Sequence, residues 1–162
     1  MTKTDDAVLR DQLTALLKGG QAHATFSDAV AHFPAARISD RPAGTPYSAW
    51  QLVEHIRIAL HDILEFVSNS EYVELEWPSG YWPQNAAPGK DESWNAAVKA
   101  IHADMKSFEI LVHSPDSNLY AAIPWGKNGE TLLREVLLAA DHTSYHVGEL
   151  ILLRRVLGIW EK

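Results

Sequence analysis

Four segments of this chain repeat apolar residues at steps of four and three, and this periodicity restricts the chain to helices packed side by side. The segment near residues 130–157 shows the pattern most fully, with an inward seam of Leu132, Val136, Ala139, Thr143, His146, Leu150, Leu153 and Leu157. The other three segments lie near residues 5–33, 48–69 and 91–113. The sequence therefore predicts an all-α fold without a β-sheet.

Capping residues mark two ends of the predicted helices. Ser48 and Gln51 form a capping box at the start of the second helix, and Tyr47 and Leu52 can add a hydrophobic staple. Gly158 is a natural stop for the last helix.

The first segment contains a glycine pair, Gly19 and Gly20, which costs a helix about 2 kcal/mol relative to alanine. The apolar pattern keeps its phase across the pair. One long helix over residues 5–33, bent at the glycines, is therefore the favoured interpretation, and two separate helices are the alternative.

Residues 70–90 form a long connection rich in proline and aromatic residues. A connection of this length can travel along a helical bundle, so the second and third helices can run parallel. Trp77, Tyr81 and Trp82 are costly to leave in water. They either close one side of the core or line a substrate pocket, and the two roles are compatible.

Two histidines stand four residues apart in the last segment. His142 and His146 share one face of a helix, one turn apart, and can bind one metal ion together. Because a metal site usually needs three protein ligands, we expect a third on another helix, and His55 beside the seam of the second helix is the candidate. Glu149, three residues after His146, is placed to border the site or to orient a ligand.

Small residues surround the inward-facing His146 and leave room for a cavity: Ala139, Ala140, Thr143, Ser144 and Gly148. The other histidines have no partner at metal-binding spacing. Asp62 shares the face of His55 but lies about 10.5 Å away along the helix axis, so it can only support the site indirectly.

The chain has no cysteine, so a metal site must use His, Asp, Glu and water. Thr143 stands where a zinc protease of the zincin type has glutamate, and no histidine has the glutamate three residues earlier that di-iron bundles use. A site with three histidines suits Zn²⁺ or Ni²⁺ best, with Fe²⁺ and Mn²⁺ as further candidates.

Length and composition favour a single globular domain, residues 1–162, with 46% hydrophobic residues. The net charge of −7 argues against a nucleic-acid partner. No run of 18 apolar residues exists and the N-terminal residues are polar, so we expect a cytoplasmic protein without a membrane segment.

Two stretches, SAWQLVEHIRIALHDILEF and LLREVLLAADHTSYHVGELILLRRVLG, resemble the DinB-like (DinB/YfiT) superfamily of bacterial proteins. The shared pattern is one histidine on the second helix, His-x-x-x-His on the fourth, and a following Gly-Glu-Leu with paired arginines. The resemblance implies an up-down-down-up four-helix bundle with His55, His142 and His146 as metal ligands. It also implies a homodimer, although no interface can be assigned.

Superfamily members with known activity depend on a thiol: mycothiol-dependent maleylpyruvate isomerases and bacillithiol S-transferases. The resemblance therefore implies a metal that activates a low-molecular-weight thiol for S-transfer or isomerisation of a small-molecule substrate. We expect the substrate pocket to be walled by residues 139–148, including Thr143, and roofed by Trp50 and Trp82. The alternatives are a hydrolase that uses metal-bound water, with Glu149 as the base, and a bundle that binds a metal or small ligand without catalysis.

Overall fold

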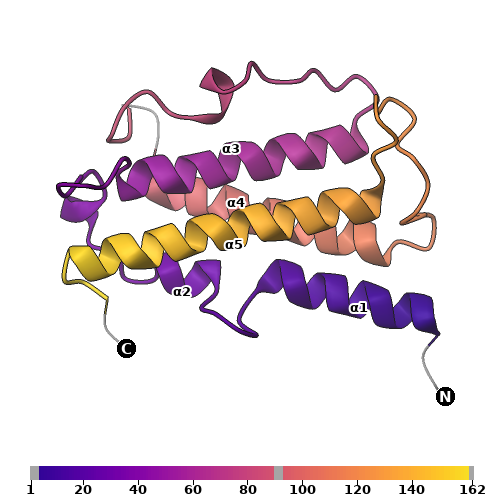
Figure 1. Ribbon diagram of the computed structural model, residues 1–162, viewed down its shortest axis with the longest axis horizontal. Coiled ribbons are helices and arrows are strands. Elements are labelled where there is room, and N and C mark those ends of the chain that lie inside the picture. The colour runs from indigo at the N-terminus through magenta and orange to yellow at the C-terminus, as the bar shows by residue number, and fades with distance from the viewer. Residues whose placement is uncertain (1–3, 90–92, 161–162) are drawn as a thin grey trace.

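The computed structural model of the protein describes residues 4–89 and 93–160, and the regular structure in these ranges is helical (Figure 1). It consists of five α-helices: α1 (Asp5–Lys18), α2 (Phe26–Val30), α3 (Ala49–Ser68), α4 (Trp94–His113) and α5 (Leu132–Val156). Two short 3₁₀ helices, η1 (Ala35–Arg37) and η2 (Ser79–Tyr81), lie in the connections. Across these ranges the only β-type pairing is one isolated bridge, Ala122 with Thr131. The prediction of an all-α fold is confirmed for the described residues.

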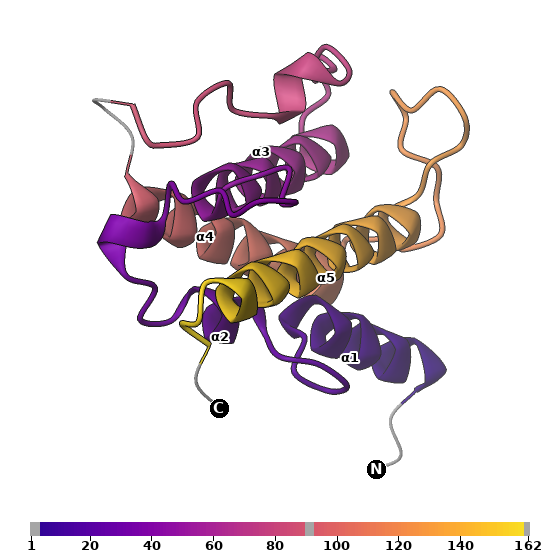
Figure 2. The same ribbon diagram turned by 60° about the vertical axis from the view of Figure 1, so that its left-hand side comes forward.

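Three long helices form the centre of the molecule, and α3 packs against both α4 and α5. The helices α3 and α4 run in the same direction, whereas α1 and α5 run in the opposite direction (Figure 1). Residues 69–89, which follow α3, pass over the outer side of that helix (Figure 2). Among the described helices, none is long and apolar enough to cross a membrane.

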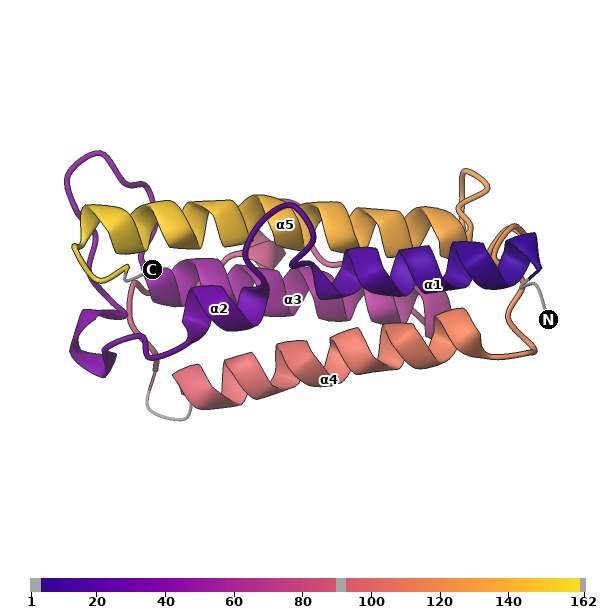
Figure 3. The ribbon, with the colours of Figure 1, turned by 90° about the horizontal axis from the view of Figure 1, so that it is seen from below.

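The first predicted helix is in fact two helices, so the favoured prediction of one helix over residues 5–33 is wrong. Gly19 and Gly20 have φ values of 68° and 81°, which end α1. A new capping box then starts α2, because Thr25 and Asp28 each accept a hydrogen bond from the other's backbone N–H. The two helices follow one another on the side of the molecule that faces the viewer in Figure 3, and both pack against α5.

The predicted capping box at the start of α3 is confirmed. The backbone N–H of Gln51 donates to Ser48 Oγ at 3.2 Å, and the backbone N–H of Ser48 donates to Gln51 Oε1 at 3.1 Å. Ser93 caps α4 in a similar way, and the predicted start of that helix at residues 91 and 92 lies outside the described residues. These caps fix where each helix begins, and thereby which residues face the core.

The C-terminal end of α5 is tied to the end of α2 by Arg154. Its buried guanidinium donates to the backbone oxygens of Ala29 at 2.9 Å and Ala31 at 2.7 Å. The backbone N–H of Gly158 then bonds to Arg155 O and that of Ile159 to Arg154 O, which is a Schellman motif. Gly158 has φ +70°, so it ends the last helix as predicted.

Candidate metal centre

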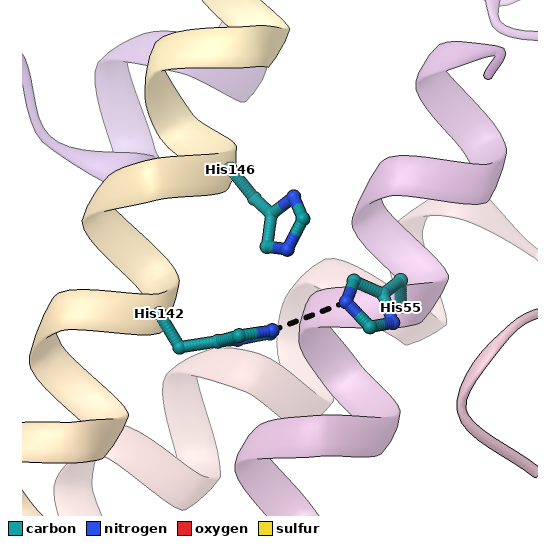
Figure 4. Close-up of side chains that lie close together, drawn as sticks. All are labelled: His55, His142 and His146. Atoms are coloured by element: carbon teal, nitrogen blue, oxygen red, sulfur yellow. Dashed lines mark hydrogen bonds between the residues drawn. The ribbon is translucent and has the colours of Figure 1, made fainter. Parts of the chain in front are cut away.

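Three imidazole rings meet between the middle of α3 and the middle of α5 (Figure 4). His55 projects from α3, and His142 and His146 project from consecutive turns of α5. The Nε2 atoms of His55 and His142 are 3.1 Å apart, and one ligand nitrogen from each of the three rings lies within 4.8 Å of the others. The structure thus brings together the three histidines that the sequence nominates.

Hydrogen bonds fix the orientation of two of these rings. Nδ1–H of His55 donates to the backbone oxygen of Tyr81 at 2.7 Å, and Nδ1–H of His146 donates to Glu149 Oε2 at 2.6 Å. Because Nδ1 carries the proton in each neutral ring, Nε2 is left with a lone pair directed toward the other histidines. Glu149 therefore orients a histidine, which is one of the two roles that its spacing predicts.

Aromatic stacking fixes the plane of the His55 ring. Trp82 lies parallel to His55, with ring centroids 3.8 Å apart and an angle of 5° between the planes. Tyr47 covers the opposite face of Trp82 at 3.9 Å and 16°. The three stacked rings come from the residue before the N-cap of α3, from the second turn of α3 and from the connection after it, so that connection helps to position a site residue.

Burial keeps the three rings neutral. It lowers the pKa of His142 and of His146 to about 4, and it also lowers the pKa of His55. The 3.1 Å contact between Nε2 of His142 and Nε2 of His55 is therefore a hydrogen bond that neutral His142 donates.

This donor set fits a divalent metal ion. Two nitrogens bound at about 2.0–2.1 Å to a tetrahedral metal are about 3.3 Å apart, close to the spacing of His55 and His142. Metal-bound histidines ordinarily donate their second ring N–H to a carboxylate or a backbone carbonyl, as His146 and His55 do here. A bound ion would replace the hydrogen bond between His142 and His55.

A cavity of about 560 Å³ opens beside the three rings. It is lined by aromatic residues, Tyr47, Trp77, Tyr81, Trp82 and Tyr145, and by Ala59, Ile63 and Leu138. Two carboxyl groups, those of Asp62 and Glu149, complete the lining together with the histidines. A small molecule can therefore reach the nitrogen atoms from outside.

Of the three residues predicted for the substrate pocket, Trp82 lines this cavity, whereas Trp50 and Thr143 do not. Trp50 is 1% exposed and belongs to the hydrophobic core, because the first turn of α3 directs it inward. Thr143 follows His142 by one residue and so points about 100° away around the helix, into a narrow separate hollow that Leu17 and Met105 also line.

Sequence reasoning missed Leu138 and Tyr145 as cavity residues. Both lie on the face of α5 that carries His142, at steps of four and three from it. This spacing is visible in the sequence and was sufficient to nominate them.

Asp62 contributes through the connection that follows α3. Its carboxylate accepts hydrogen bonds from the hydroxyls of Tyr72 at 3.0 Å and Tyr81 at 2.8 Å. The same Tyr81 offers its backbone oxygen to His55. Asp62 therefore anchors the segment that orients a histidine, and this indirect support matches its predicted place.

Comparisons of the chain with protein-family models, with curated proteins and with solved structures gave no match in any of the three.

Proposed function

We propose that this protein binds a divalent metal ion through His55, His142 and His146 and uses it to activate a low-molecular-weight thiol for S-transfer or isomerisation. The observation that carries the proposal is the convergence of three neutral imidazoles beside an accessible cavity. Zn²⁺ and Ni²⁺ are the metals that best suit such a nitrogen donor set.

We also propose that the chain is a DinB-like four-helix bundle, in which α1 and α2 together correspond to the first helix of the bundle. In Figure 1, α1 and α5 run in one direction and α3 and α4 run in the opposite direction. This arrangement supports the up-down-down-up order. The resemblance of the two histidine-bearing stretches and their meeting in space support the same assignment. A homodimer is part of this proposal, and sedimentation would show it as twice the 18.0 kDa chain mass.

A divalent metal bound here would act as a Lewis acid that favours the thiolate form of a coordinated thiol. The chain's own residues supply the rest. Glu149 holds the ring of His146, while Tyr81 and Trp82 hold the ring of His55. The aromatic and aliphatic walls of the cavity keep an electrophile next to the nucleophile and limit the water around it.

The first experiment is metal analysis of the protein purified without a histidine tag and without added metal. About one equivalent of Zn²⁺ or Ni²⁺ per chain is expected, and His146→Ala should contain none. His61→Ala is the matched control, because His61 contacts Asp104 outside the cluster and its loss should leave the metal content unchanged.

The second experiment follows the consumption of a panel of small thiols in the presence of a reactive electrophile. The metal-loaded protein should consume at least one thiol faster than the His146→Ala variant does. Equal rates for every thiol on the panel would reject thiol transfer for that panel. The metal analysis alone would then decide whether the protein binds a metal ion.

A metal-dependent hydrolase is the second candidate, because the carboxyl of Glu149 lines the cavity and burial raises its pKa. Such a group can serve as a general base toward metal-bound water. Ester hydrolysis without any thiol, lost in Glu149→Gln even when both proteins are saturated with metal, would favour this candidate. A bundle that binds its ligand without catalysis would show metal binding and no turnover in either assay.

A further inference from the structure

The charged side chains that line the cavity beside the histidines are all acidic. Asp62 and Glu149 are its carboxyl groups, and the described lining includes no lysine or arginine. A site built to recognise a carboxylate or phosphate normally presents arginine or lysine. Apart from a bound metal, this cavity offers an anionic group no counter-charge.

Among the described residues, the carboxylate of Asp62 accepts hydrogen bonds from neutral groups only. Its two oxygens each accept one phenol hydrogen bond, from Tyr72 and Tyr81. In the described ranges no lysine or arginine forms an ion pair with it. Each carboxylate oxygen has two acceptor sites, so capacity for a charged donor remains.

Two aromatic rings at the cavity are largely open to solvent. Trp77 is 76% exposed and Tyr145 is 65% exposed, and both line the cavity. Trp82 differs, because Tyr47 and His55 cover its two faces. Exposed tryptophan and tyrosine faces next to a carboxylate are the elements from which proteins build sites for organic ammonium ions.

We propose that the cavity selects a ligand with an organic ammonium group on a small apolar body, held by Trp77 and Tyr145 and neutralised by Asp62. A volume of about 560 Å³ lies within the range of small-molecule sites. This inference rests on the proposed function in one respect, that the same cavity leads to the metal. It identifies the substrate class as cationic thiols or electrophiles rather than carboxylates or phosphates.

The test compares three probes that share a benzyl group and differ in charge at neutral pH: benzyltrimethylammonium, benzyl alcohol and phenylacetate. Binding is followed by isothermal titration calorimetry on metal-free protein, so that phenylacetate cannot gain affinity by coordinating a metal. Benzyltrimethylammonium should bind about tenfold more tightly than either other probe. Equal or tighter binding of phenylacetate or benzyl alcohol would overturn the inference.

Variants locate the binding. Asp62→Asn, Trp77→Ala and Tyr145→Ala should each weaken benzyltrimethylammonium binding about fivefold. Tyr120→Ala is the aromatic control, because Tyr120 is similarly exposed and lies outside the cavity. An unchanged affinity in both Trp77→Ala and Tyr145→Ala, with helical content intact by circular dichroism, would also overturn the inference.

Metal binding and the preference for benzyltrimethylammonium are measured separately, so each can contradict one proposal without the other. A wild-type protein that binds metal without a preference for the cation contradicts only the inference. A wild-type protein that prefers the cation and binds no metal contradicts only the proposed function.

Discussion

The contact between His146 and Glu149 illustrates how single residues prepare the candidate metal centre. Glu149 accepts the Nδ1–H of His146 at 2.6 Å, which sets the tautomer that presents Nε2 to a metal. If His146 binds a metal, removing the negative charge of Glu149 should make it a weaker ligand. Its glutamine variant keeps a hydrogen-bond acceptor, so the ring orientation can persist.

Glu149→Gln should therefore lower the affinity for Zn²⁺ about tenfold without unfolding the protein. Calorimetric titration of Zn²⁺ measures this effect. Glu71→Gln is the control, because Glu71 is exposed and absent from the cavity lining. An affinity in Glu149→Gln equal to that of the wild type would show that Glu149 does not support the ligand.

The neutral histidines also predict how the stability of the metal-free protein depends on pH. Their pKa values are lowered in the folded state, to about 4 for His142 and His146. In the unfolded chain a histidine titrates near about 6.5, so between these values the unfolded chain binds more protons. The free energy of unfolding should fall as the pH decreases from about 6.5 to about 4, and this contribution should level off below that range.

Urea unfolding at several pH values in the presence of a chelator measures this dependence. A double variant, His142→Asn with His146→Asn, should lose less stability over the same pH range because it lacks two of the shifted groups. If wild type and double variant show equal slopes, the folded-state pKa values of these histidines are not lowered.

The sequence was sufficient to nominate the three histidines but not all of the groups around them. The spacing of His142 and His146 determines their common face on any helix, and His55 follows from the seam of its own helix. The stacking of Trp82 on His55 depends on the path of the long connection after α3. The spacing of apolar residues within helices does not predict that path. The sequence predicts Trp50 at the pocket, but the rotation of the first turn of α3 buries it in the core.

At the scale of helices, the break between α1 and α2 shows why a continuous pattern of apolar residues does not prove a continuous helix. Both helices pack against α5, so both present apolar residues to one core without being one helix. Gly20 has φ +81°, and a Cβ there would lie 2.9 Å from Cγ2 of Thr25. Backbone conformation, which the apolar pattern does not record, decides the outcome at this position.

Two glycine substitutions should therefore have opposite effects on stability. Gly20→Ala should lower the free energy of unfolding by more than about 1 kcal/mol, through the positive φ and the contact with Thr25. Gly148→Ala should raise it by about 0.5–1 kcal/mol, because Gly148 lies inside α5 and a Cβ there meets no described atom within 4 Å. Thermal unfolding measures both, and a stabilising Gly20→Ala would contradict the assigned turn.

For the whole molecule, the three histidines of the candidate metal centre join two helices that are far apart in the sequence. His55 on α3 and the two histidines on α5 can hold one ion only when these helices are packed together, so metal binding is linked to folding.

Saturation with metal should therefore raise the free energy of unfolding. At a free metal concentration roughly 100 times Kd, the increase should be about 2.7 kcal/mol. Denaturant unfolding with and without Zn²⁺ measures it. His146→Ala should unfold at the same denaturant concentration in both conditions, whereas His61→Ala should keep the full increment.

The hydrogen bond from His55 to the backbone oxygen of Tyr81 has a consequence for how this protein can evolve. Every amino acid has this oxygen, so any residue at position 81 that preserves the local chain path can orient His55. Related proteins can therefore replace the tyrosine and keep the site where another contact, such as that of Tyr72 with Asp62, holds the connection in place. A comparison of residue identities among related proteins would not reveal the hydrogen bond between His55 and this backbone oxygen. Insertions or deletions in the connection after α3 would disrupt it.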